Sequence, residues 1–281
     1  MDKRSKYLAV IILAAVVLAA TAYYFNSLEN FSWLARYDNV MTSNAVLSQL
    51  YGIAQNASLA DNIGIGTVPV GPKGALPFVT NSNKLLVGAN GKPMVLYVGA
   101  DYCPFCAVTR WSLILALMRF GNFTELHYMT SSAVDYAPYT PTFTFYNSHY
   151  SSNVINFTDF EIAKNIFNST INNYEPLQTV PSQYNNVVVY YSEEYTGKPN
   201  YPIPVVDYGN YSVEIGAMAE PLILRGDNWS TIISDLKNPS TEISQGIVGA
   251  ADVMTAQICH AINNNASVCT EPYVKNYESD I

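Results

Sequence analysis

The sequence predicts an α/β fold: a central sheet with flanking helices, an insertion between the two halves of that sheet, and an N-terminal transmembrane helix ahead of it. Three observations carry this prediction. The apolar run Met94–Gly99 has the length of a buried strand and leads directly into a long helical pattern. Ile203-Pro204 precedes two short strand patterns around a glycine-containing turn, which is typical of a hairpin. A last helical pattern covers residues 243–262.

The N-terminus has the pattern of a membrane anchor. Residues 1–6 include three basic side chains, and an uncharged, mostly apolar run covers residues 7–25. That run is about long enough to cross a bilayer as a helix. The basic residues before it predict that residues 1–6 are a cytoplasmic tail, that residues 7–25 are a single-pass anchor in the lipid bilayer of the cell membrane, and that the main domain is extracytoplasmic. Ala20-Thr21-Ala22 also fits a cleavage site, so a removed signal peptide is the alternative.

Residues 26–83 predict a stalk that joins this anchor to the main domain. Apolar residues recur at helical spacing between residues 39 and 60, which indicates a short amphipathic helix. Basic residues are absent from it, so packing on the main domain or within the stalk is favoured over a membrane surface. Residues 63–83 are rich in Gly, Pro and Asn and predict an extended linker. The main domain then covers residues 84–281.

The first half of the main domain predicts a βαβ unit. Residues 126–129 could form a strand parallel to Met94–Gly99 after the intervening helix. An insertion is expected at about residues 131–186. The patterns within and after it indicate strands at 142–146 and 154–157, a helix at 159–171, and either a strand or a buried helix at 187–191.

Charge is scarce in this chain. Charged residues make up 13% of it and the net charge is −8, whereas a typical soluble domain has about 25% charged residues. The negative charge and the absence of basic clusters exclude nucleic acid as an expected partner. A surface with so little charge would change little when its carboxylates become protonated. We therefore hypothesise that the protein tolerates an acidic exterior.

Cys103-Pro104-Phe105-Cys106 is the motif that carries chemistry. A CxxC at a strand-to-helix junction places the first sulfur at a helix N-terminus, where free N–H groups and the helix dipole favour a thiolate. The thiolate is the form that attacks disulfides. Pro104 suits the first helical position because its missing N–H would have no partner there. The motif predicts that Cys103 is the exchanging sulfur and that Cys106 resolves the mixed disulfide.

A second cysteine pair lies near the end of the chain. Cys259 and Cys269 flank an asparagine run at residues 263–265, and closing this short loop would stabilise the fold by about 2–3 kcal/mol. We expect a structural disulfide. The alternatives are a redox pair that relays electrons to Cys103 and Cys106, free buried thiols, or zinc ligation together with His260. The spacing matches no common zinc pattern, so no metal is expected.

Eight Asn-x-Ser/Thr sequons favour an extracytoplasmic, glycosylated surface. The candidate acceptors are Asn30, Asn56, Asn122, Asn156, Asn168, Asn210, Asn228 and Asn265. The three histidines share no spacing, and none is expected to act as a catalytic base.

These elements resemble the thioredoxin order: a strand, a CxxC helix, another strand, an X-Pro-led hairpin and a last helix. More closely, the chain is similar to the archaeal domain-of-unknown-function family 929, which is related to thioredoxins. The segments that carry this similarity are the run from Tyr97 to Cys106, Arg110-Trp111, Ile203-Pro204-Val205 and the late Cys259 and Cys269.

The resemblance implies that Pro204 is a cis-proline facing the CxxC and that the backbone before it binds substrate peptide. It implies a peptide groove shaped by Tyr102, Pro104, Phe105, Ile203 and Pro204. Trp111 is expected in the core, and Arg110 could stabilise the Cys103 thiolate. Two departures leave the direction of electron flow open. Many thioredoxins have a buried acid where this chain has Tyr97, and an ionised Asp101 would raise the pKa of Cys103.

The expected function is an extracytoplasmic thiol–disulfide oxidoreductase that acts on thiols and disulfides of exported proteins. A membrane or soluble redox partner must regenerate the cysteine pair, and no prosthetic group is required. Two other classes stay open. One is a noncatalytic, glycosylated surface or binding protein in which the CxxC is inaccessible, and the other is a zinc-stabilised binding module.

Overall fold

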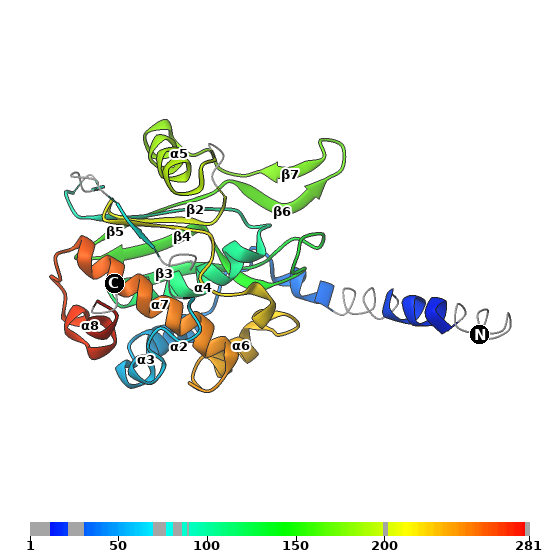
Figure 1. The fold of residues 1–281 in the computed structure, drawn as a ribbon, viewed down its shortest axis with the longest axis horizontal. Helices are drawn as coiled ribbons and strands as arrows, with labels where there is room; N and C mark the ends of the chain where they lie inside the picture. Colours follow the sequence, from blue (N-terminus) through cyan, green and yellow to red (C-terminus); the bar gives the residue numbers. More distant parts are fainter. Residues whose placement is uncertain are drawn as a thin grey trace, which may run out of the picture.

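The computed structural model describes residues 12–21, 31–69, 77–80, 86–88, 90–198 and 202–278. It has a central five-stranded mixed sheet with flanking helices (Figure 1). The sheet order is β1-β9-β8-β2-β5. Its strands are β1 (Phe78–Val79), β2 (Met94–Gly99), β5 (Asn156–Glu161), β8 (Val205–Tyr208) and β9 (Ser212–Ile215). The other strands form two hairpins: β3 (Gly121–Thr130) with β4 (Pro141–Ser152), and β6 (Ala163–Asn168) with β7 (Asn173–Pro176).

Helices cover both faces of this sheet (Figure 1). On one side lies α5 (Ser182–Thr196), and on the other lie α4 (Pro104–Met118) and α7 (Glu242–Ala261). Smaller helical elements surround this second layer. They are η1 (Ser32–Tyr37), α2 (Asn44–Ala54), α3 (Ala57–Ile63), η2 (Pro221–Leu224), α6 (Trp229–Asp235), η3 (Ser267–Thr270) and α8 (Pro272–Glu278).

Strand β2 is the centre of the sheet because it is apolar on both faces. All six of its residues are buried. Val95 and Tyr97 pack in the main core with α4 and α7, while Leu96 and Val98 pack in a smaller core with α5. Alternate residues of a strand point to opposite faces, so a continuous apolar run is what a strand covered by two helical layers requires. The prediction for Met94–Gly99 is confirmed.

The parallel partner of β2 differs from the prediction. Residues 126–129 lie within β3, which pairs antiparallel with β4 outside the central sheet. The parallel neighbour is β5, in register from Met94↔Asn156 to Gly99↔Glu161. The β3–β4 hairpin instead covers α4, where the Thr142 hydroxyl donates to the Ala107 carbonyl over 2.8 Å. Strand β5 has the sequence Asn-Phe-Thr-Asp-Phe-Glu, so hydrophobicity alone does not mark it as a strand of the central sheet.

The expected insertion also has different boundaries. Residues 131–186 contain β5, which belongs to the central sheet. The chain between the strands of that sheet therefore carries two separate hairpins, β3–β4 and β6–β7, rather than one insertion. The helix expected at 159–171 is wrong, because that stretch holds the end of β5 and all of β6. Residues 187–191 lie within α5, which agrees with the helical alternative. The hairpin of β8 and β9 and the helix expected at 243–262, which is α7, are where the sequence predicted them.

The described part of the expected stalk lies in the body of the domain. Leu34, Leu47, Leu50 and Ile53 belong to the main hydrophobic core. The amphipathic segment forms α2 and α3, and α2 begins at the N-cap Ser43, whose side chain accepts the Val46 N–H. Since residues 31–69 bury apolar side chains against α4 and α7, they are part of the fold rather than a spacer.

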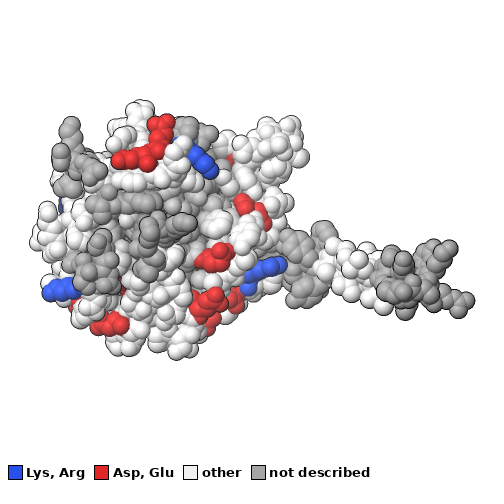
Figure 2. Space-filling view, in the orientation of Figure 1, with Lys and Arg blue, Asp and Glu red and all other residues white. Residues whose placement is uncertain are grey.

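Within the expected anchor, residues 12–21 are helical and the rest lies outside the described residues. No helix in the described part of the chain is long and apolar enough to cross a membrane. On the face shown in Figure 2, acidic side chains are scattered among larger uncharged areas and basic side chains are fewer, in line with the composition.

Candidate functional site

The CxxC motif lies where the central strand β2 gives way to α4. Cys103 is the N-cap residue of α4, and its sulfur accepts the backbone N–H of Cys106 at 3.3 Å. Pro104 occupies the first helical position, as predicted. The first sulfur therefore lies where the free N–H groups of the helix stabilise negative charge.

The two cysteines are free thiols with different access to solvent. Cys103 keeps 6% of its surface exposed, while Cys106 has none. The peptide bond between Ile203 and Pro204 is cis, and the Ile203 carbonyl oxygen is 4.0 Å from the Cys103 sulfur. The structure thus brings together the two segments that the sequence analysis linked, 100 residues apart. The Ile203 backbone therefore lies beside the sulfur that a partner thiol would approach.

Aromatic side chains surround Cys103. Tyr102 stacks on Tyr174 of β7, with ring centres 3.8 Å apart and an angle of 2° between the rings. Phe105 is 38% exposed and stacks on Tyr136, with ring centres 5.8 Å apart. Tyr136 and Tyr174 were not predicted as site residues. Both lie in the region assigned to the insertion, and no motif marks them.

A buried polar cluster lies beneath the motif. Arg110 of α4 is fully buried, and its Nη1 donates to both carboxylate oxygens of Glu161, each at 3.0 Å. The same nitrogen lies 3.2 Å from the Tyr97 hydroxyl and 3.2 Å from the Ala100 carbonyl. Glu161 ends β5, directly beside Gly99 of β2. Trp111, the next residue of α4, is in the core as expected, and its indole N–H donates to the Pro141 carbonyl at 2.9 Å.

These contacts shift the pKa values of the two thiols in opposite directions. The pKa of Cys103 is lowered, first by the hydrogen bond with the Cys106 side chain and then by the Cys106 backbone N–H and the charge of Arg110, with burial opposing them. Burial raises the pKa of Cys106 well above its usual value. Cys103 is therefore the thiol of the pair that more readily becomes a thiolate, which suits an attacking sulfur, while Cys106 suits a resolving one.

Burial raises the pKa values of two acids near the motif. Burial raises the pKa of Asp101, although Arg110 and a hydrogen bond with Thr144 oppose this rise. Burial likewise raises the pKa of Glu161, opposed by Arg110. Asp101 is 2% exposed and was noted from the sequence, but Glu161 was missed because its stretch was assigned to a helix. A buried acid is therefore present beneath the motif, on β5 instead of at Tyr97.

Two further buried acids lie in the hairpin of β8 and β9. Asp207 accepts the Asn210 N–H at 2.6 Å, and the Tyr208 hydroxyl donates to Glu214 at 2.8 Å. Neither carboxyl has a cationic partner among the ion pairs of the described residues. Burial raises the pKa of Asp207 to about 7 and that of Glu214 to about 8.

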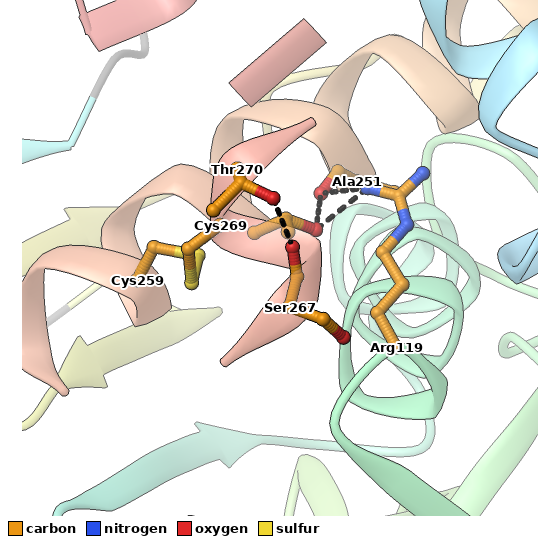
Figure 3. The surroundings of a disulfide bond; sticks show 7 residues. Arg119, Ala251, Cys259, Ser267, Cys269 and Thr270 are labelled. Atoms are coloured by element: carbon orange, nitrogen blue, oxygen red, sulfur yellow. Dashed lines mark hydrogen bonds between the residues drawn. A yellow bond between two sulfur atoms is a disulfide. The ribbon is translucent and has the colours of Figure 1, made fainter. Parts of the chain in front are cut away.

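The late cysteines lie away from this site, at the end of α7. Cys259 and Cys269 are joined in a disulfide, with Cα atoms 5.5 Å apart (Figure 3). The η3 turn that carries Cys269 is closed by a hydrogen bond from the Thr270 hydroxyl to the Ser267 carbonyl. Nearby, Arg119 of α4 donates to the Ala251 carbonyl, which ties α4 to α7.

This disulfide bears on the zinc alternative. It uses two of the donors that a zinc site would need, and the third, His260, stacks on Tyr211 with ring centres 4.8 Å apart. No group of three metal-ligating side chains lies together within the described ranges. His127 and His149 lie on the β3–β4 hairpin, apart from the cysteines.

The sequons differ in accessibility. Asn30 lies outside the described residues. Three acceptors are exposed: Asn56, Asn122 and Asn265. Four are partly buried: Asn156, Asn168, Asn210 and Asn228. The side-chain nitrogen of Asn156 already donates to Asn90 and to the Lys92 carbonyl, and a glycan there would replace one of its two N–H groups and so break at least one of these hydrogen bonds.

Comparison with known proteins identifies the family. The family described as Domain of unknown function (DUF929) matches residues 78–260, which include the CxxC motif, Arg110, Glu161 and Ile203-Pro204. Curated proteins and solved structures gave no match. Since the matched stretch covers more than half of the chain, the protein belongs to the DUF929 family.

Proposed function

We propose that this protein is a thiol–disulfide oxidoreductase that acts on the cysteines of other proteins through Cys103 and Cys106. The observation that carries the proposal is the environment of Cys103. It caps the N-terminus of α4, its pKa is lowered, and it alone of the pair reaches solvent, beside the Ile203 backbone. A structural thiol needs none of these features, whereas a nucleophilic thiol needs a stabilised thiolate and access to solvent.

The order of elements supports a thioredoxin-like fold. Strand β2, the CxxC helix α4, the parallel strand β5, the Pro204-led hairpin and α7 follow one another as in the thioredoxin order. The β3–β4 and β6–β7 hairpins are additions to that order, and the second supplies Tyr174 beside the motif. Fold likeness alone does not establish activity, so the proposal depends on the cysteine environment.

In the oxidising direction, the reaction begins with the Cys103–Cys106 disulfide. A substrate thiolate attacks the Cys103 sulfur, a substrate–Cys103 disulfide forms, and Cys106 leaves with the electron pair. A second substrate thiolate then attacks the substrate sulfur of that bond and releases Cys103 as a thiolate. The substrate loses two electrons and gains a disulfide, while the protein becomes a dithiol. A partner that carries a disulfide of its own reoxidises the pair by the same exchange.

Stabilisation of the Cys103 thiolate favours this direction. Arg110, the Cys106 N–H and the helix N-terminus stabilise a charge that exists only in the reduced protein. An interaction that stabilises the reduced form makes the disulfide more oxidising. We therefore assign the protein the role of disulfide donor.

The N-terminal sequence supports a location outside the cytoplasm, with residues 7–25 as the anchor or as a cleaved signal and with glycans on the exposed sequons. Disulfide formation is the chemistry of such compartments, so the proposed location and activity agree. The substrates are then the thiols of exported proteins.

Trapping of a mixed disulfide tests the activity. The full-length Cys106→Ser variant, mixed with a peptide disulfide, should hold the peptide on Cys103, whereas Cys103→Ser should hold none. Intact mass spectrometry, with and without reductant, reads out the adduct. Absence of an adduct from Cys106→Ser would contradict the proposal and favour a noncatalytic binding protein.

A further inference from the structure

A pocket beside the CxxC motif has no role in the exchange reaction described so far. Its volume is about 380 Å³, and Phe105 forms part of its wall. Met218 and Ile223 add apolar surface, and Gly246 of α7 lies at the same site. A Cβ atom on residue 246 would come within 2.9 Å of the Ile223 side chain, so glycine keeps this space open.

The edge of the pocket is acidic. Glu220 and Glu242 line it, and no lysine or arginine among the described residues does. Both side chains are exposed, and neither belongs to an ion pair among the described residues. Glu220 shares a hydrogen bond with Tyr136, the ring that stacks on Phe105, which links the acidic edge to the motif.

An apolar wall with carboxylates at its edge fits one kind of side chain. Lysine and arginine have apolar stems that pack on hydrophobic surface and cationic heads that stay near water. A cation can also lie over the face of an aromatic ring such as Phe105. A purely apolar side chain would form no ion pair with the two carboxylates, and an acidic one would be repelled by them.

We propose that this pocket selects substrates that carry a lysine or arginine within a few residues of the reactive cysteine. The stem of that residue packs on Phe105, Met218 and Ile223, and its charged head lies between Glu220 and Glu242. Phe105 lies in the motif itself, so a peptide sulfur held at Cys103 brings neighbouring side chains within reach of the pocket. This inference rests on the proposed function and adds a substrate class to it.

The test uses peptides that contain one cysteine and one variable residue. The variable residue is lysine, methionine or glutamate, and it is placed in turn at each of the two positions before and the two positions after the cysteine. That cysteine is capped as a disulfide with a chromogenic aryl thiol. The reduced full-length protein attacks it: the Cys103 thiolate bonds to the peptide sulfur and the aryl thiolate leaves with the electron pair. At one position at least, the lysine peptide should react about fivefold faster than the glutamate peptide, and added salt should reduce that ratio.

Two variants locate the selectivity. Glu220→Gln with Glu242→Gln should bring the ratio of the lysine rate to the glutamate rate close to one. Glu193→Gln, an exposed acid on α5 across the sheet, should leave the ratio unchanged. Because each ratio is taken within one variant, a general loss of activity cancels.

The outcomes separate this inference from the proposed function. Equal rates for all three peptides, or a ratio that survives the double variant, would overturn the pocket assignment while exchange itself stands. Hydroxyethyl disulfide, a small uncharged substrate, serves as the reference. A protein that reacts with neither this disulfide nor any peptide would overturn both.

Discussion

Cys103 and Cys106 lie at the beginning of a helix, whereas Cys259 lies in the last turn of one and is bonded to Cys269 in the η3 turn beyond it. Helix N-termini stabilise a thiolate, while the partial negative charge at a C-terminus disfavours it. The first pair also lies above Arg110 and beside the Ile203 backbone. Two buried cysteine pairs in one chain thus differ in chemistry because of where each lies on its helix.

The two buried ion pairs of α4 show the same division. Arg110 pairs with Glu161 beneath the reactive cysteines, and Arg119 pairs with Asp252 of α7 at 2.5 Å. Arg119 also donates to the Ala54 carbonyl and the Thr255 hydroxyl, so it holds α4, α7 and the end of α2 together. The Arg110–Glu161 pair therefore affects the pKa values of the thiols, and the Arg119–Asp252 pair holds the helices in place.

The largest expected effect comes from removing the reactive sulfur. Cys103→Ser should lower the rate of peptide disulfide exchange by about a thousandfold or more, because a hydroxyl at neutral pH is a far weaker nucleophile than a thiolate. Stopped-flow measurement with the chromogenic peptide gives the rate. Cys259→Ala with Cys269→Ala is the matched control, and it should keep the parental rate. Loss of exchange in that control would show that the second pair relays electrons.

The next effect concerns the two arginines. Arg110→Met and Arg119→Met each leave a buried carboxyl without its partner, so each should lower the free energy of unfolding by about 3–5 kcal/mol. Only Arg110→Met should raise the pKa of Cys103, as followed by thiolate absorbance during titration.

Glu161→Gln changes the other member of the Arg110–Glu161 pair and keeps the size and shape of the side chain. It removes a negative charge next to the buried thiol, so it should lower the pKa of Cys106, opposite to the effect of removing Arg110. A shift in the same direction for both variants, or an equal shift in Arg119→Met, would contradict the assignment of the cluster.

Removing the late disulfide should have a smaller effect, and on stability alone. Cys259→Ala with Cys269→Ala should lower the free energy of unfolding by about 2–3 kcal/mol, since the bond closes a short loop. Urea denaturation of the full-length protein measures this. No loss of stability would mean that the bond has a role other than the structural one.

The last expected effect is a gain in stability at mildly acidic pH. The pKa of Asp207 is raised to about 7 and that of Glu214 to about 8, above the usual value of about 4 for a carboxyl. A raised pKa in the folded state gives stability that is present below the unfolded pKa and is lost as pH rises through the folded pKa. The free energy of unfolding should therefore fall as the pH rises from 5 to 8.

Neutral variants of these two acids test the origin of that pH dependence. Asp207→Asn and Glu214→Gln should flatten the profile in urea denaturation, because their side chains no longer titrate. A protein that is less stable at pH 5 than at pH 8 would contradict this account and the hypothesis of tolerance to acid.

The sequence predicted those parts of the site that depend only on residues close together in the chain. The buried strand, Pro104 at the first helical turn and the Pro204-led hairpin each have a local pattern. The partner of Arg110 could not be predicted, because Glu161 meets it only through the parallel pairing of β5 with β2. That pairing was assigned to residues 126–129, since they form the first short strand pattern after the CxxC helix. Tyr136 and Tyr174 depend in the same way on where the added hairpins fold back.

The reduction potentials of the two pairs, measured side by side in the full-length protein, test the central claim most directly. Equilibration with glutathione followed by mass analysis of alkylated thiols reports both. The account predicts that Cys103–Cys106 equilibrates near the oxidising end, at about −120 to −180 mV, while Cys259–Cys269 stays oxidised in buffers of about −300 mV. A Cys103–Cys106 pair that never equilibrates, or two pairs that titrate together, would contradict it.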